Sequence, residues 1–140
     1  MTETELKHRT KAFSLRVIRL VDAMPRSISG RAIASQLMES SSSVAANYRS
    51  ACRARSRADF LSKITVVEEE ADESLFWLEM IEESGKVEAS RLCELKDEAD
   101  QLVAIFTAIG RTTKRTLRKN SDERPRPPKQ GAVEKRPPRA

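Results

Sequence analysis

The stretch SSSVAANYRSACRARSRADF (Ser41–Phe60) decides the fold, because it is either a polar loop or the junction of two helices. Serine costs a helix only a few tenths of a kcal/mol relative to alanine, roughly, and a long packed stripe outweighs that sum. Such a stripe is present, with steps of four and three at Ile33, Leu37, Ser41, Val44, Tyr48 and Ala51. The serines therefore lie inside a helix, and with Ala45, Ala46 and Ala51 they form a narrow face that neighbouring helices can approach closely.

The second half of the same stretch begins another helix. Ser56 is followed three residues later by Asp59, the spacing at which each side chain can satisfy a free backbone amide at a helix start. Downstream, an apolar stripe runs at Phe60, Ile64, Val67, Ala71, Leu75, Leu78 and Ile81. Ser84-Gly85 ends this helix, because glycine accepts the left-handed conformation of a helix cap.

Two more helices flank this pair. The first is expected over about Thr4–Ala23, with its stripe at Leu6, Thr10, Phe13, Val17, Leu20 and Met24, and Pro25 turns the chain after it. The last carries Leu92, Leu95, Ala99, Leu102, Phe106 and Ile109 and then becomes basic. Short connections make consecutive helices antiparallel. The sequence thus predicts an all-α, antiparallel up-down-up-down four-helix bundle over residues 1–119, followed by a disordered basic Pro/Arg/Lys-rich tail over residues 120–140.

Charge is strongly segregated along the chain, although the formal net charge is only +5. Residues 61–100 carry 4 basic and 13 acidic side chains, whereas residues 111–140 carry 11 basic and 3 acidic ones. Residues 1–60 are also basic, with 11 basic and 5 acidic side chains. The two basic ends are suited to attract phosphates or an acidic partner.

The sequence lacks the residues that most kinds of catalytic site require. A di-metal bundle site needs Glu-x-x-His pairs on two helices, but His8 is the single histidine. No histidine lies near a serine or cysteine nucleophile, and Cys52 and Cys93 are expected as buried thiols. We expect no enzyme, catalytic residue, metal, cofactor or small-molecule substrate. An N-terminal signal and an apolar run of about 20 residues are both missing, which predicts a cytoplasmic protein without a membrane partner.

A cluster of cations is the strongest functional lead. In an up-down bundle, the turn between the second and third helices lies near the start of the first helix and the end of the fourth. The candidate nucleic-acid-binding residues at that end are Arg49, Arg53, Arg55, Arg57, Arg111, Lys114, Arg115, Arg118 and Lys119, which Lys7, Arg9 and Lys11 could join. Aromatic residues that would stack on bases are missing apart from Tyr48. A solubilising role, or pairing with the acidic third helix, is an equal alternative.

The apolar stripe of the third helix is wider than one bundle seam requires. Phe76, Trp77 and Met80 widen it near its end, and excess apolar width indicates a second interface. Asn47 is either a satisfied amide at a helix contact or a contact to a partner. The candidate oligomer interface therefore comprises Asn47, Phe76, Trp77 and Met80.

The chain resembles a bacterial family of four-helix bundle proteins encoded within intervening sequences of large-subunit ribosomal RNA genes. The resemblance covers about Phe13 to Phe106 and is carried by Gln36-Leu37, Ser42-Ser43-Val44-Ala45-Ala46-Asn47, Asp59-Phe60, Glu73 and Trp77. It implies a homopentamer without known catalytic activity, similar in fold to the accessory proteins of diversity-generating retroelements, which contact a reverse transcriptase and nucleic acid. After Asn47 the chain departs from the common pattern, because YRSACRARSR (Tyr48–Arg57) is basic and lacks glycine.

Two functional hypotheses follow. The first is a non-enzymatic homo-oligomeric bundle that binds RNA, DNA or a nucleoprotein through its basic end, as a retroelement accessory protein does. The second is a protein-protein scaffold without a nucleic-acid role, which docks its partner on the acidic third helix or the basic tail.

Overall fold

A computed structural model describes residues 1–123 of the chain as four α-helices. Their bounds are α1 Glu3–Asp22, α2 Ile28–Ala51, α3 Arg57–Glu83 and α4 Ala89–Glu123. The predicted tail began at residue 120, but α4 continues as a helix to Glu123. The rest of that predicted tail lies outside the described residues.

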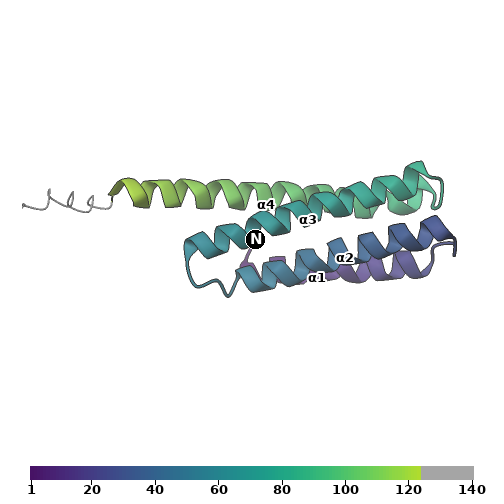
Figure 1. Cartoon of the computed structure of the whole chain (residues 1–140), viewed down its shortest axis with the longest axis horizontal. Coiled ribbons are helices and arrows are strands. Elements are labelled where there is room, and N and C mark those ends of the chain that lie inside the picture. The colour runs from purple at the N-terminus through teal and green to yellow at the C-terminus, as the bar shows by residue number, and fades with distance from the viewer. Residues whose placement is uncertain (124–140) are drawn as a thin grey trace, which may run out of the picture.

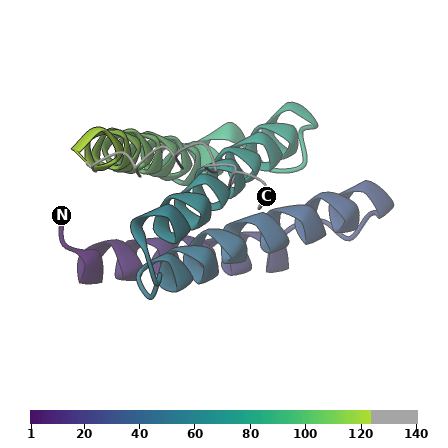
Figure 2. The same ribbon diagram turned by 60° about the vertical axis from the view of Figure 1, so that its left-hand side comes forward.

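The helices pack in chain order, α1 on α2, α2 on α3 and α3 on α4, while α1 and α4 approach each other much less. Figures 1 and 2 show consecutive helices running in opposite directions, with α1 and α2 side by side and α3 crossing between that pair and α4. This arrangement confirms the predicted all-α up-down-up-down bundle. α4 has 35 residues and α1 has 20, so α4 is longer by about 22 Å and extends past its neighbours (Figure 1).

Side-chain caps fix where the helices begin. Thr2 accepts from the N–H of Glu5 at 3.1 Å and Glu5 accepts from the N–H of Thr2 at 2.9 Å, a complete capping box. Ser56 caps α3 as predicted, by accepting from the N–H of Asp59 at 3.1 Å. The Asp59 carboxylate, however, accepts from the N–H of Arg55 at 3.3 Å and does not return to Ser56.

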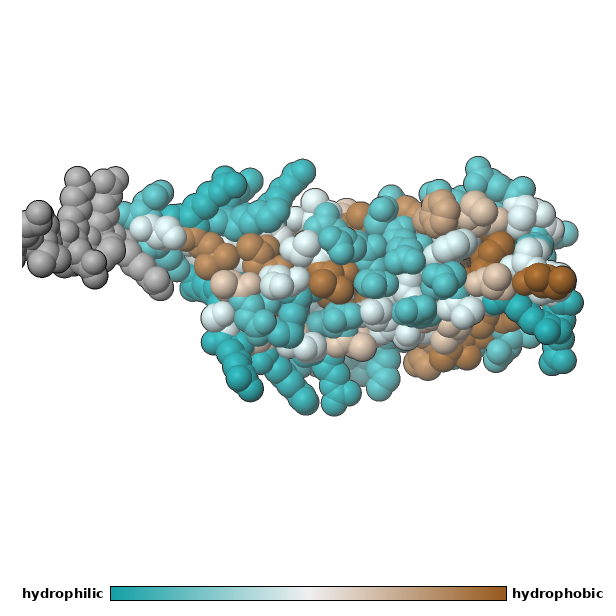
Figure 3. Space-filling model, viewed as in Figure 1, coloured by the Kyte–Doolittle hydropathy of each residue, from teal (hydrophilic) through white to brown (hydrophobic). Residues whose placement is uncertain are grey.

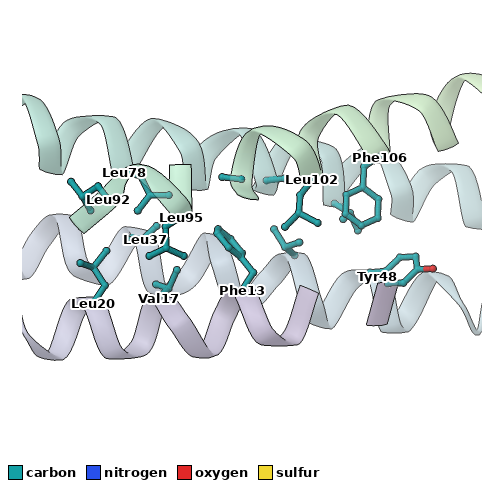
Figure 4. Close-up of a cluster of buried hydrophobic side chains, with 14 of the residues drawn as sticks. Phe13, Val17, Leu20, Leu37, Tyr48, Leu78, Leu92, Leu95, Leu102 and Phe106 are labelled. Atoms are coloured by element: carbon teal, nitrogen blue, oxygen red, sulfur yellow. The ribbon is translucent and has the colours of Figure 1, made fainter. Parts of the chain in front are cut away.

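The core is aliphatic and matches the predicted stripes closely. Every stripe residue predicted for α1 and α2 is buried, as are most of those for α3 and α4. Figure 4 shows these side chains meeting between the helices, with Tyr48 of α2 near Phe106 of α4, and the centroids of these two rings lie 5.4 Å apart. Phe60, Leu75 and Ile109 are only half-buried, at the edges of the core.

Fewer of the small residues of α2 are buried than the sequence predicted. Ser40 and Ser41 are buried, and the Oγ atoms of Ser40 and Ser74 lie 3.0 Å apart across the contact between α2 and α3. Ala45 is half-buried and Ala46 is exposed. At 3.6 residues per turn, Ala46 lies on the opposite side of α2 from the buried Val44, so the prediction that it packs against a neighbouring helix was wrong.

Enlarging a side chain at the serine contact should overpack it. Ser40→Leu is expected to lower the free energy of unfolding by about 1–3 kcal/mol, because Ser40 is 1% exposed and faces Ser74. Ser35→Leu is the matched control, since Ser35 is exposed on the same helix. Chemical denaturation of both variants measures the difference, and equal stability of the two would show that the contact between α2 and α3 is loosely packed.

Candidate functional site

Three segments of the chain meet at one end of the bundle. Figures 1 and 2 place the N-terminus of α1, the turn between α2 and α3, and the C-terminal end of α4 on the same side of the molecule. Figure 3 shows hydrophilic side chains projecting from both edges of this end, with a line of hydrophobic side chains between them. The convergence expected from antiparallel helices is therefore present.

A cleft at the turn between α2 and α3 gathers three of the predicted arginines. It encloses about 290 Å³ and is lined by Ala46, Arg49, Ser50, Arg53, Arg55, Asp59 and Lys63. Asp59 is its one carboxylate, and Lys63 lies 2.7 Å from it. Within residues 1–123 none of the three guanidinium groups takes part in an ion pair. The cleft is thus cationic, and its single acid is already neutralised.

The lysine contact also sets the protonation of the carboxylate. The hydrogen bond from Lys63 lowers the pKa of Asp59, and the backbone N–H of Arg55 lowers it further. Asp59 therefore stays ionised, fastening the first turn of α3 to the preceding loop. A bound anion would meet the arginines without competition from a free carboxylate.

A second cleft lies between α1 and α2 and shares a wall with the first. It encloses about 420 Å³ and is lined by Thr4, Lys7, His8, Lys11, Ser42, Ala45, Ala46 and Arg49. Ala46 and Arg49 line both clefts. We call the two clefts together the basic groove. Lys7 lies 3.1 Å from Glu3, but both side chains are exposed, and an exposed pair of this kind contributes little.

The other predicted cations lie outside the basic groove. Arg57 is exposed at the first residue of α3. The remaining ones are exposed on the last turns of α4: Arg111, Lys114, Arg115, Arg118 and Lys119. The end of α4 extends past its neighbours (Figure 1), so these cations lie on and next to a separate basic projection at the same end.

Arg9 connects two helices and is not available to bind a ligand. Its Nε donates to both carboxylate oxygens of Glu98, at 2.9 and 3.2 Å, and its Nη2 donates to one of these oxygens at 2.6 Å and to Gln101 at 2.7 Å. The hydrogen bond to Glu98 is the first cause of its raised pKa. These contacts tie α1 to α4, so Arg9 does not belong to the groove it was expected to join.

Sequence reasoning missed Lys63, His8 and the groove floor. Lys63 follows Asp59 by four residues, the spacing of a helical ion pair, and that signal placed it one turn inside α3. The helical period places Ala46 opposite the buried Val44, and that signal could have identified Ala46 as exposed.

The predicted oligomer residues lie on α2 and α3. Phe76 is 49% exposed and Met80 is 36% exposed on α3. Trp77 is half-buried against the core, and its ring meets that of Phe76 edge-on at a centroid distance of 4.9 Å. Asn47 donates to the carbonyl oxygen of Ser43 at 2.9 Å and to its Oγ at 2.8 Å, so its amide is satisfied within α2.

The acidic side chains of α3 do not neutralise the arginines. In the described part of the chain, no carboxylate forms an ion pair with Arg49, Arg53, Arg55 or Arg57. The acids instead repel one another: burial raises the pKa of Glu70, and the charges of Glu73, Glu39 and Glu69 raise it further. The structure therefore keeps the acidic surface of α2 and α3 apart from the basic groove.

Metal-binding groups, cysteines and apolar helices are other features that could support a function among residues 1–123. No group of three or more His, Cys, Asp or Glu side chains there could hold a metal ion. Cys52 is half-buried and Cys93 is exposed, so the expectation of two buried thiols was wrong. Cys52 packs against the edge of the core. None of the described helices combines the length and apolarity required to cross a bilayer.

Comparison with known proteins adds a family and a fold. Residues 2–108 match the family model described as 23S rRNA-intervening sequence protein. A crystal structure from Bacteroides thetaiotaomicron VPI-5482, described as a protein with unknown function from the S23 ribosomal protein family, superposes with a TM-score of 0.73. It is 23% identical, and the match covers 79% of this chain and 99% of that one. No curated protein matches the chain.

The repulsion around Glu70 should be visible in the pH dependence of stability. Because its pKa is raised in the folded state, its stabilising contribution is present below the ordinary glutamate pKa, about 4.3, and is lost as the pH rises through the raised value. Glu70→Gln should therefore raise the melting temperature at pH 7 but not at pH 4. Glu83→Gln, at the exposed end of α3, is the control. An equal gain at both pH values would contradict the assignment.

Proposed function

The chain belongs to the 23S rRNA-intervening sequence protein family, and from that premise we propose that it is a non-enzymatic, homo-oligomeric bundle that binds nucleic acid through its basic groove. The observation that carries the proposal is the sharing of Arg49 and Ala46 by two clefts. The shared wall joins lysines of α1 to arginines of the turn between α2 and α3 in one continuous cationic surface.

A polyphosphate is the ligand that suits this surface. Nucleic-acid affinity depends largely on cations that neutralise phosphates and release counterions. Arg49, Arg53 and Arg55 have no ionic partner within residues 1–123, so they can contact phosphates without breaking an existing pair. The exposed cations at the end of α4 extend the same field beyond the groove and would steer a polyanion toward it.

Assembly would multiply this surface. Phe76 and Met80 are exposed apolar side chains among the exposed carboxylates of the second half of α3, and exposed apolar groups of this kind favour a protein contact. We propose a second copy of the chain as that partner, with five copies as the stoichiometry that the sequence resemblance implies. Several groups of cations on one particle would raise affinity through multivalency.

A scaffold without a nucleic-acid role is the second candidate. The same exposed Phe76 and Met80 favour it, because they would serve another protein, including a reverse transcriptase, as well as a second copy. The two functions differ in what the basic groove does, and salt dependence separates them.

Nucleic-acid binding should weaken with salt in proportion to the phosphates contacted. Arg53→Gln combined with Arg55→Gln should flatten the slope of log affinity against log salt by about 0.7 per lost contact on a single strand, or about 0.9 on B-DNA. Arg26→Gln with Arg31→Gln removes the same charge at the exposed opposite end and should change the slope little. Fluorescence anisotropy over a salt series measures both variants. Absence of binding at low salt would favour the scaffold.

The oligomer should depend on α3. Phe76→Glu with Met80→Glu is expected to give a monomeric mass by light scattering at micromolar concentration, because charge is excluded from an apolar interface. Leu15→Glu with Ile18→Glu is the matched control on α1, where these residues are 47% and 38% exposed. A monomeric wild-type chain would remove the oligomer from the proposal, and dissociation by the control pair alone would move the interface to α1.

A further inference from the structure

The two halves of the basic groove differ in chemistry. The cleft at the turn between α2 and α3 is lined by polar and charged side chains, apart from Ala46. The cleft between α1 and α2 has a small apolar floor made by Ala45 and Ala46, with cations on its walls. A phosphate is suited to the first environment, whereas the flat face of a nucleobase is suited to the second.

We propose that the cleft between α1 and α2 receives an unpaired nucleobase while Arg49, at the wall shared by the two clefts, holds the adjoining phosphate. This inference rests on the proposed function and deepens it, because it makes single-stranded nucleic acid the preferred ligand. The path of the strand then continues past Arg49 to Arg53 and Arg55 in the cleft at the turn between α2 and α3.

The floor favours a base over a phosphate. Ser42 Oγ donates to the carbonyl oxygens of Met38 at 2.7 Å and Glu39 at 3.2 Å, so its proton is directed at its own helix. Ala45 and Ala46 offer only methyl groups and bring no side chain into the space above them. With a volume of about 420 Å³, the cleft falls within the range of small-molecule sites, about 300–1,000 Å³.

The cations beside the floor continue from one cleft into the other. Arg49 lies in the last turn of α2, and Arg53 follows the C-cap residue Cys52. Both line the cleft at the turn between α2 and α3, and Arg49 also lines the cleft between α1 and α2. One strand can therefore place a base in the cleft between α1 and α2 while its neighbouring phosphates contact both arginines.

A duplex cannot use the same site. The axes of two packed helices lie about 8–10 Å apart, so the groove between α1 and α2 cannot admit a double helix, whose major groove alone is about 12 Å wide. A duplex also keeps its bases paired, whereas proteins read RNA mostly from unpaired bases that can be splayed out. Duplex nucleic acid would therefore touch only the cations at the rim.

The test fills the floor without changing any charge. Ala46→Leu places a larger side chain at the wall shared by both clefts, and Ala32→Leu is the matched control, because Ala32 is exposed on α2 and lines neither cleft. The probes are a fluorescently labelled mixed-sequence RNA strand of about 16 nucleotides and the same strand annealed to its complement. Anisotropy is measured at low salt with the full chain, and circular dichroism checks that both variants melt as the wild type does.

The expected result is tighter binding of the single strand by the wild type, with Ala46→Leu weakening that binding about tenfold while leaving the duplex and the Ala32→Leu variant unaffected. Equal wild-type affinity for both probes would overturn the inference and leave the proposed function standing. The inference would also be overturned, with the proposed function left standing, if Ala46→Leu changes the binding of neither probe or weakens the binding of both equally. Absence of binding to either probe would remove the proposed function and the inference together.

Discussion

The close contact between α2 and α3 is the constraint on which the rest of the structure depends. Ser40 and Ser74 are buried with their Oγ atoms 3.0 Å apart, and Ser40 also donates to the carbonyl oxygen of Leu37 at 3.2 Å. Small side chains let the two helices approach, and local hydrogen bonds remove the cost of burying their hydroxyl groups. The turn that joins α2 and α3 is short, so its arginines are confined to one end of the bundle.

The attachment of α1 decides which cations remain available for a ligand. α1 packs along α2 and approaches α4 much less, so long side chains connect α1 to α4: Arg9 reaches Glu98 and Gln101. Those contacts engage Arg9 but leave Lys11 and Arg49 free to line the cleft between α1 and α2. The contacts that secure α1 therefore divide the cations into structural ones and ones that face solvent.

Periodicity in the sequence was sufficient to predict the helices and their core. Apolar steps of three and four identified the buried face of each helix, and Ser56 marked the start of α3 as the structure confirms. Ala46 was predicted to pack but proved exposed, although the same periodicity, applied strictly, places it opposite the buried Val44. Periodicity cannot supply the distance between neighbouring helices. Nor can it tell which of several nearby carboxylates pairs with a cation, since Arg9–Glu98 joins residues 89 positions apart. The basic end was predictable from antiparallel topology, whereas the groove depended on these side-chain pairings.

Separation along α3 allows assembly and ligand binding to occur together in the proposed particle. Lys63 lines the basic groove near the start of α3, and Phe76 lies 13 residues further on the same helix, which corresponds to about 20 Å of helix rise. A contact between copies centred on Phe76 and Met80 therefore need not cover the groove. Since the acidic side chains of α3 lie around the apolar ones, charges near such an interface would be of one sign, and its stability must come from apolar burial. Salt would then weaken ligand binding at the groove while leaving the assembly intact, because screening removes attraction in the groove but only like-charge repulsion at the interface.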